Sequence, residues 1–113
     1  MNSPVLTPTG YDDYTRLFDA LSHPTRIKIV GVLAEGRRYV SELAKTVNMS
    51  RPLLYIHLKK LEEANLVTGS YEISDLGKTM KFFELKHFSI HLTPSLLMDV
   101  ARTIPMQSDA VPN

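Results

Sequence analysis

Apolar residues recur at helical spacing through the first 64 residues, and the pattern divides this part of the chain into four helices. In the first, over residues 11–21, four apolar residues fall at intervals of three and four and therefore share one side of a helix. They are Tyr14, Leu17, Phe18 and Leu21. The second helix is expected to begin at Pro24, because proline fits the first turn of a helix, with His23 as its cap. Its expected inward positions are Ile27, Val30, Leu33 and Ala34, and Gly36 is expected to end it.

A short third helix and a longer fourth helix follow, separated by only a few residues. Ser41 is the expected N-cap of the third helix and Ser50 that of the fourth. The fourth helix then carries Pro52 in its first turn and runs to about residue 64. Two helices joined by so short a turn are typical of a helix-turn-helix.

Beyond residue 65 the pattern changes to that of a β-hairpin. Residues 66–73 and 80–86 are rich in β-branched and aromatic side chains, and residues 74–77 between them have the composition of a turn. Residues 87–92 are a candidate extension of the second strand. In that strand Phe82 and Phe83 are expected to point to opposite faces. The inward ring would join the core, and the outward ring would pack on the last helix or a dimer partner, or help to bind an apolar ligand.

The sequence after residue 92 predicts one more helix. Thr93 and Pro94 have the order of an N-cap and a first helical residue, and Pro105 is expected to end the helix. Its apolar positions are Leu96, Leu97, Val100, Ala101 and Ile104.

Together these elements predict a mainly α-helical domain with a β-hairpin, in the order of four helices, two strands and a final helix. We expect one domain over residues 11–104, because a chain of 113 residues is too short for two. Residues 1–10, which contain two prolines and a glycine, are expected to form a flexible arm. Residues 105–113 are expected to form a flexible tail.

Composition excludes several classes of function. The chain has no cysteine, which excludes disulfides, thiolate metal sites and a cysteine nucleophile. No apolar run approaches the roughly 18 residues that cross a bilayer, and residues 1–10 lack the regions of a signal peptide. There is no glycine-rich phosphate loop, nucleophile motif or carboxylate pair of the kind that enzymes use. We therefore expect a cytoplasmic protein that has no enzymatic activity and needs no cofactor.

The formal net charge of +1 conceals an uneven distribution of charge. Residues 37–66 contain six basic and three acidic residues, whereas the segments on either side carry no excess of positive charge. The basic segment includes the predicted helix-turn-helix. Charge and helical spacing therefore point to the same part of the chain.

The fourth helix has an apolar side and a basic side. At about 100° per residue, Leu54, Leu58 and Leu61 cluster together, with Leu53 and His57 beside them, so His57 is expected to be a packed core residue. The opposite side of the first half contains no acid. It carries Arg51, Pro52, Tyr55 and Lys59, with Ile56 at its margin. A basic, acid-free side next to a helix N-terminus is typical of a helix that enters the major groove of DNA.

These side chains fit particular contacts with DNA. Arg51 can donate two hydrogen bonds to guanine, Tyr55 can donate to a phosphate or a base edge, and Ile56 can contact a thymine methyl group. The lysines that can neutralise phosphates are Lys59 and Lys60 on the helix and Lys78 and Lys81 near the hairpin turn. The alternative is that these residues form an ordinary solvated surface.

Two parts of the sequence resemble the ArsR-type family of winged-helix transcription regulators. The stretch LFDALSHPTRIKIV over residues 17–30 is similar to the opening signature of that family. Residues 41–44, 49–50 and 58–67, which read SELA, MS and LKKLEEANLV, are similar to its helix-turn-helix. The resemblance extends over roughly residues 14–86.

The resemblance implies a winged helix-turn-helix fold and a homodimeric repressor that binds double-stranded DNA. The hairpin would be a wing beside the minor groove or the phosphates. The resemblance also implies that the first and last helices form the dimer interface. The candidate interface residues are Tyr14, Leu17, Phe18, Leu96, Leu97, Val100 and Ile104. The residues that match base- and backbone-contacting positions are Arg51, Pro52, Tyr55 and Ile56, and Ser50 at the start of the helix is a further DNA-binding candidate.

The chain departs from the metal sensors of that family at their ligand positions. Those proteins use cysteines on the helix-turn-helix, or His and Asp on the last helix, whereas this chain offers only Asp99 there. His87 and His91 lie four residues apart, but two ligands do not complete a site. We therefore expect no metal site, and the sequence leaves open whether the protein responds to any effector.

Two other functions remain compatible with the sequence. The protein can be a constitutive or architectural DNA-binding protein that has no effector. It can also be a winged-helix module for protein–protein contact, although such a module is expected to carry an apolar or acidic fourth helix.

Overall fold

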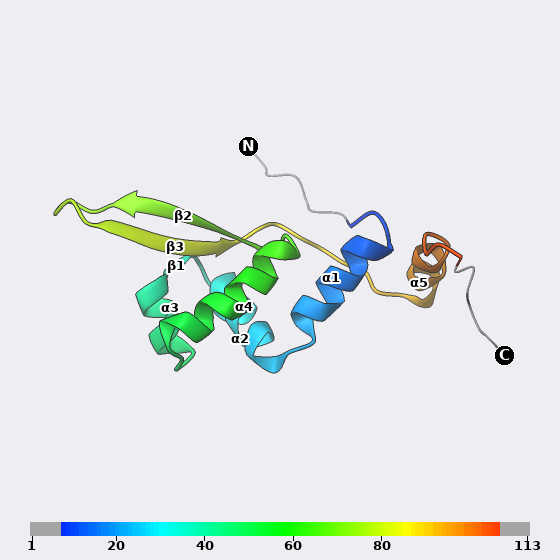
Figure 1. Ribbon diagram of the computed structural model, residues 1–113, viewed down its shortest axis with the longest axis horizontal. Helices are drawn as coiled ribbons and strands as arrows, with labels where there is room; N and C mark the ends of the chain where they lie inside the picture. The colour runs from blue at the N-terminus through cyan, green and yellow to red at the C-terminus, as the bar shows by residue number, and fades with distance from the viewer. Residues whose placement is uncertain (1–7, 107–113) are drawn as a thin grey trace.

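The computed structural model describes residues 8–106, which form five helices and a three-stranded sheet (Figure 1). The helices are α1 (Tyr11–Leu21), α2 (Pro24–Ala34), α3 (Val40–Thr46), α4 (Arg51–Glu63) and α5 (Pro94–Ala101). The strands are β1 (Arg38–Tyr39), β2 (Val67–Ile73) and β3 (Thr79–Leu85). The predicted class, mainly helical with a β-hairpin, is confirmed. Most of the predicted arm and tail, residues 1–7 and 107–113, lies outside the described residues.

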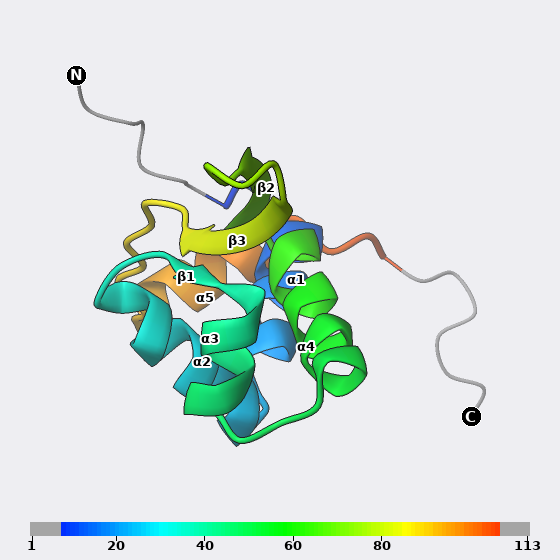
Figure 2. The ribbon, with the colours of Figure 1, turned by 90° about the vertical axis from the view of Figure 1, so that its left-hand side faces the viewer.

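Helices α1 to α4 and the base of the hairpin share one apolar core. Viewed along the long axis of the molecule, the sheet lies along one side of the helices (Figure 2). The largest fully buried side chains are Phe83, Ile29, Leu43, Leu54, Leu58, Leu61, Leu66 and Val67. Because Phe83 and Val67 belong to the hairpin, the base of the hairpin is anchored in the same core that holds the helix-turn-helix. Among the described helices, none is long and apolar enough to cross a membrane.

The sheet has the order β1-β3-β2, and both pairings are antiparallel. Strand β1 contains only two residues, which is too few for an alternating pattern, and the sequence did not predict it. The predicted extension of the second strand over residues 87–92 is wrong. Strand β3 ends at Leu85, and the amide of Lys86 makes the last hydrogen bond, to the carbonyl of Leu66 (2.9 Å). Within the described residues, the segment 87–92 forms no strand, and Phe88 makes only an isolated β-bridge.

The inward side of α2 differs from the prediction. Ile27 is 55% exposed and Ala34 is also exposed, whereas Ile29 is completely buried. Arg26 occupies a further inward position, where its guanidinium is hydrogen-bonded inside the protein. Hydrophobic periodicity counts an arginine as an outward residue, so the predicted buried side of α2 was rotated away from the observed one. His23 caps the helix as predicted, by accepting a hydrogen bond from the amide of Thr25 (3.2 Å).

Helix α3 begins earlier than predicted, because Tyr39 and not Ser41 is its N-cap. The backbone N–H of Tyr39 donates to the carboxylate of Glu42 (3.0 Å), which is one half of a capping box. Helix α5 begins as predicted, since Thr93 Oγ1 accepts a hydrogen bond from the amide of Leu96 (3.0 Å). It ends at Ala101, before the predicted stop at Pro105.

Candidate nucleic-acid interface

The two sides of α4 differ as the sequence predicted. Ser50 caps the helix by accepting a hydrogen bond from the amide of Leu53 (3.4 Å). Leu54, Leu58 and Leu61 are completely buried, which fixes the rotation of the helix in the core. The predicted contact residues remain exposed, and they are Arg51, Pro52, Tyr55, Ile56 and Lys59.

A tight turn connects α3 to α4. The amide of Met49 donates to the carbonyl of Ala44 (3.0 Å), and Asn48 adopts a left-handed backbone conformation with φ of 55°. Asparagine tolerates this conformation better than most residues. The turn therefore fixes α4 relative to α3, and the predicted helix-turn-helix is confirmed.

The exposed side of α4 faces a groove that the hairpin completes. We call it the wing groove and define it by Arg51, Tyr55, Tyr71, Lys78 and Lys81, which line it together with the start of α3. Its volume is about 510 Å³. Four of its residues are DNA-binding candidates predicted from the sequence, two from the helix and two from the hairpin. The fold thus brings residues that are 30 positions apart in the chain onto one surface.

Lys81 lies among three aromatic rings at the base of the wing groove. Its Nζ is 5.1 Å from the ring centroids of both Tyr71 and Phe83, and 5.6 Å from that of Tyr55. Aromatic faces attract a cation at these distances. None of the ion pairs among the described residues involves Lys81, so its charge remains available to an anion in the groove.

Tyr71 is a groove residue that the sequence analysis missed. It lies on β2, is exposed, and pairs directly with Lys81 across the hairpin. The pairing of this aromatic residue with Lys81 is the signal that points to it, once the register of the two strands is known.

Lys60 lies apart from the other predicted contacts. Its Nζ is 3.7 Å from a carboxylate oxygen of Asp19 on α1, on a different side of α4 from the wing groove. Lys60 therefore lies beside an acidic side chain, whereas Lys59 is in none of the ion pairs among the described residues.

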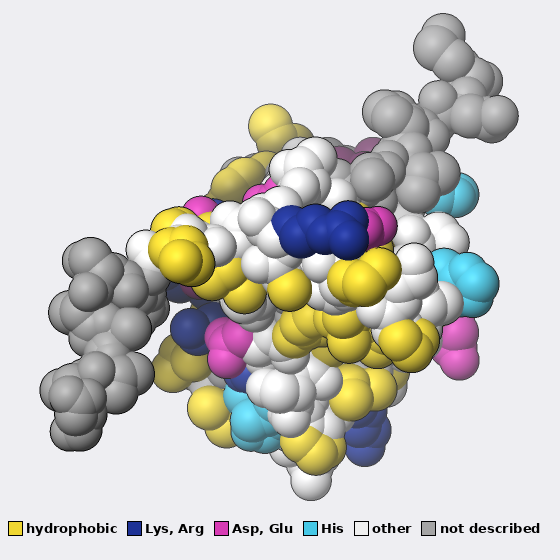
Figure 3. All heavy atoms as spheres, turned by 90° about the vertical axis from the view of Figure 1, so that its right-hand side faces the viewer, with side chains coloured by type: hydrophobic (Ala, Val, Ile, Leu, Met, Phe, Trp, Pro, Cys, Tyr) yellow, Lys and Arg dark blue, Asp and Glu magenta, His cyan; other side chains and the backbone are white. Residues whose placement is uncertain are grey.

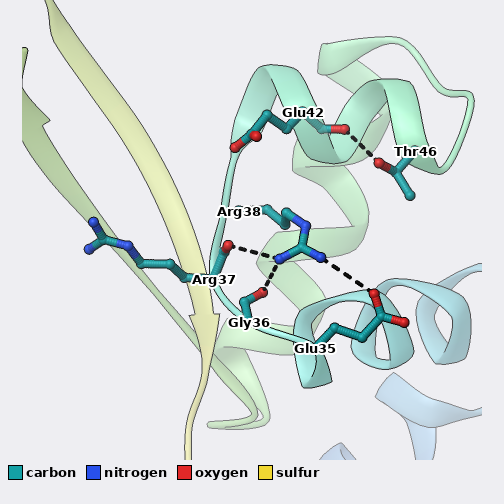
Figure 4. Close-up of polar contacts among 6 residues, drawn as sticks. All are labelled: Glu35, Gly36, Arg37, Arg38, Glu42 and Thr46. Atoms are coloured by element: carbon teal, nitrogen blue, oxygen red, sulfur yellow. Dashed lines mark hydrogen bonds and ion pairs between the residues drawn. The ribbon is translucent and has the colours of Figure 1, made fainter.

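A polar cluster attaches the hairpin to the start of α3. The carboxylate of Glu72 on β2 accepts hydrogen bonds from the hydroxyl of Tyr39 (2.7 Å) and from Nη2 of Arg37 (2.9 Å). The Tyr39 hydroxyl, followed by Arg37, holds the pKa of Glu72 below its usual value, and the same carboxylate raises the pKa of Tyr39. Two neighbouring side chains point in opposite directions here: Arg37 is directed toward the sheet and Arg38 toward α2 (Figure 4).

The same cluster corrects the prediction for Phe82 and Phe83. Phe83 is in the core, and Phe82 lies on the other face of β3, but Phe82 is also buried. The guanidinium of Arg37 lies 4.0 Å from the centroid of its ring, and Tyr39 packs against its edge. Within the protomer, Arg37 and Tyr39 therefore cover the Phe82 ring that was expected to face outward.

The predicted dimerisation residues divide into two groups. Tyr14 and Leu17 are buried in the core of the protomer and have almost no surface to offer a partner. The others lie at the end of the molecule formed by α5 and α1, where hydrophobic side chains gather in a band (Figure 3). In this group Leu96 and Val100 are half-buried, and the exposed members are Phe18, Leu97 and Ile104.

His87 and His91 are both exposed in the segment that leads to α5. Within residues 8–106, no three His, Asp or Glu side chains come close enough together to hold a metal ion.

Comparison with known proteins agrees with this geometry. The profile of the bacterial regulatory protein arsR family matches residues 23–68. An uncharacterised helix-turn-helix transcriptional regulator of Methanocaldococcus jannaschii is 32% identical over 85 residues, which are 75% of this chain and 88% of that protein. The chain belongs to the ArsR family. This ArsR-family protein is a DNA-binding transcription regulator with a winged helix-turn-helix, as the sequence predicted, and its hairpin is the wing.

Other relatives match over different lengths. The transcriptional repressor SmtB of Mycobacterium tuberculosis is 45% identical over 53 residues, and the match spans 47% of this chain but only 39% of SmtB. A solved structure from Mycobacterium bovis has a TM-score of 0.60 and 25% identity, over 80% of this chain and 70% of that one. It is described as a homodimeric winged helix-turn-helix DNA-binding domain of a possible ArsR-family regulator.

Proposed function

We propose that this ArsR-family protein is a homodimeric repressor that binds a pseudo-palindromic duplex site, with α4 in the major groove. The observation that carries this proposal is the wing groove, in which Arg51 and Tyr55 of α4 share one surface with Lys78 and Lys81 of the wing. A DNA strand that contacts α4 can thereby also contact the wing. The M. tuberculosis relative is named as a repressor, which supports the same direction of regulation.

In this proposal the groove residues have distinct roles. Arg51 donates to guanine and sets the sequence preference, while Tyr55 and Ile56 contact a neighbouring base edge or methyl group. Ser50 and Pro52 lie at the helix N-terminus, where the backbone approaches a phosphate. The residues assigned to phosphates are Lys59, Lys78 and Lys81, with a smaller contribution from Lys60 because Asp19 already lies near it.

Dimerisation is proposed to occur through α5 and the adjacent part of α1. Helix α5 has no buried residue, although its sequence is rich in leucine and valine. Its exposed apolar side chains lose contact with water only if another surface covers them. A second protomer is the partner that the homodimeric M. bovis relative suggests. We therefore assign DNA binding and dimerisation to one domain over residues 11–104, and place the protein in the cytoplasm with its DNA.

Selection of bound duplexes from a random pool, followed by binding measurements on Arg51→Ala, tests the proposal. We expect Arg51→Ala to lose about 1–3 kcal/mol of binding free energy and to discriminate less at one base pair. Lys28→Ala on the exposed surface of α2 is the control and should bind like the wild type. If Arg51→Ala binds the selected duplex as tightly as the wild type, α4 does not read the sequence.

The same measurements separate a specific regulator from an architectural protein. A specific regulator prefers its selected duplex to random DNA by a factor of at least about 1,000. A ratio near one would favour the architectural alternative. Affinity should also fall steeply with salt, because each protomer neutralises several phosphates.

A further inference from the structure

The tip of the wing, residues 73–78, differs in character from the wing groove behind it. Leu76 is 91% exposed and Ile73 is 75% exposed. The charged residues of the tip are Asp75 and Lys78, whose formal charges cancel. The tip therefore has no net charge, and its large exposed side chains Ile73 and Leu76 are apolar, while Lys78 also lines the wing groove.

Hydrogen bonds hold the tip in one conformation. The amide of Ser74 donates to the carbonyl of Lys78 (2.8 Å), and the amide of Gly77 donates to the carbonyl of Ser74 (2.9 Å). The amide of Lys78 donates to the hydroxyl of Ser74 (3.1 Å). Gly77 has φ of 80°, a conformation that glycine adopts without strain. Leu76 is thus displayed on a closed turn, so little further ordering is needed when it contacts a partner.

The turn that carries Leu76 extends beyond Lys81 by a length that matters for DNA. Lys81 pairs with Tyr71, and the turn begins three residues further along β2. At about 3.3 Å per residue, the tip lies roughly 10–15 Å past Lys81. If Lys81 contacts a phosphate, as in the function proposed above, this length carries the tip across that strand and into the adjacent minor groove, which is about 6 Å wide.

We propose that Leu76, supported by Ile73, is an apolar wedge that enters the minor groove, opens one base step and bends the duplex. This inference rests on the proposed function. An exposed leucine beside an aspartate gains nothing from a phosphate, but it leaves water when it packs against sugars and base edges. Aliphatic wedges act in this way in proteins that bend DNA from the minor groove. The wedge adds a preference for a flexible pyrimidine–purine step, such as TA, under each wing.

The test compares wild type, Leu76→Asn and Leu76→Met on the duplex selected by the wild-type protein. Asparagine suits a turn, and methionine keeps an apolar side chain of similar size, so both variants should fold. Measurements are affinity at two salt concentrations, the bend angle from energy transfer between labelled DNA ends, and permanganate reactivity of thymines, which reports unstacking.

We expect wild type and Leu76→Met to bend the duplex and to expose a thymine at the step under the wing. Leu76→Asn should lose the bend and the reactive thymine, and its affinity should fall about fivefold to tenfold with an unchanged salt dependence. The wedge is wrong if Leu76→Asn keeps wild-type affinity and bend, or if the wild-type protein leaves the duplex straight and stacked.

Arg51→Ala on the same duplex distinguishes this inference from the proposed function. If Arg51→Ala weakens binding while Leu76→Asn matches the wild type, the wedge is wrong and the DNA-binding surface stands. If Arg51→Ala also matches the wild type, the proposed reading of DNA by α4 fails as well.

Discussion

Nη1 of Arg26 lies 3.2 Å from Nδ1 of His57, and this contact joins α2 to the DNA-reading helix α4 inside the protein. A guanidinium has only donors, so Nδ1 of His57 is the acceptor. Arg26 also donates to the carbonyls of Ala20 (2.7 Å) and Asp19 (3.1 Å) at the end of α1. The Asp19 carbonyl also accepts a hydrogen bond from the amide of Ser22 (3.2 Å). One side chain therefore connects three helices.

Replacing Arg26 by methionine should lower the free energy of unfolding by about 2–4 kcal/mol. Methionine fills much of the space but leaves the carbonyl of Ala20 and the ring of His57 without their donor. Lys28→Met, on the exposed side of the same helix, should change stability by less than about 0.5 kcal/mol. Urea unfolding at matched protomer concentration checks both values. Equal losses of unfolding free energy in the two variants would show that the buried hydrogen bonds of Arg26 do not stabilise the fold.

Stability should depend on pH through His57. Burial, followed by the nearby His23 and Arg26, lowers the pKa of His57 below its usual value of about 6.5. The unfolded chain therefore binds a proton at a pH where the folded protein does not. The free energy of unfolding should decrease as the pH falls from about 7.5 through 6.5 toward the lower pKa of the folded state.

His57→Gln is the control for this pH dependence, because glutamine can still accept a hydrogen bond from Arg26 but does not titrate. The variant should lose less stability than the wild type between pH 7.5 and 5.5. Parallel curves for the two proteins would contradict the assignment to His57.

Replacing two glycines by alanine should change the stability of the protein in opposite directions. A Cβ at Gly69 would lie 2.8 Å from Cε1 of the buried Phe83 ring, which is too close for a real contact. Gly69→Ala should therefore destabilise the protein by about 1–3 kcal/mol. Gly31 is exposed within α2 and has no neighbouring atom within 4 Å of a Cβ, so Gly31→Ala should stabilise by about 0.5–1 kcal/mol. Thermal unfolding of both variants checks the signs.

A charge on α5 should separate the proposed dimer. Leu97 is exposed in the protomer, so Leu97→Glu leaves the core intact but places a carboxylate in the proposed interface. Sedimentation equilibrium should show the dimer dissociation constant rising at least about tenfold. Ile27→Glu, at an exposed apolar position on α2, should leave the dimer dissociation constant unchanged. A dimer that tolerates Leu97→Glu would show that the protomers meet elsewhere.

The sequence predicted most of the fold because its strongest patterns are local. The apolar stripe of α1, the apolar side of α4, and the serine and threonine caps of α4 and α5 depend on residues within one or two turns of each other. Strand β1 was missed because it depends on a partner strand. The capping of α3 was missed because Ser41 is a more usual N-cap residue than Tyr39, whose backbone N–H donates to the side chain of Glu42. The buried Arg26 was missed because its burial is stabilised by carbonyls that only the folded chain brings to it.

The sequence also predicted only part of the candidate DNA-binding surface. The exposed side of α4 follows from helix geometry alone, and the structure keeps those residues exposed. The strand register that places Tyr71 in the wing groove and the proximity of Lys60 to Asp19 are not visible in the sequence. Both depend on how elements distant in the chain are oriented, which periodicity does not encode.

The contacts of Tyr39 have a consequence for how DNA affinity can be regulated. Its backbone holds the start of α3, and its hydroxyl holds the wing through Glu72, while Lys81 lies among rings from α4 and both wing strands. These contacts link the wing to α3 through Tyr39 and to α4 through Lys81. In the proposed dimer, a change in the angle between two protomers at α5 would move α4 and the wing of each protomer together, with the contacts inside each protomer kept.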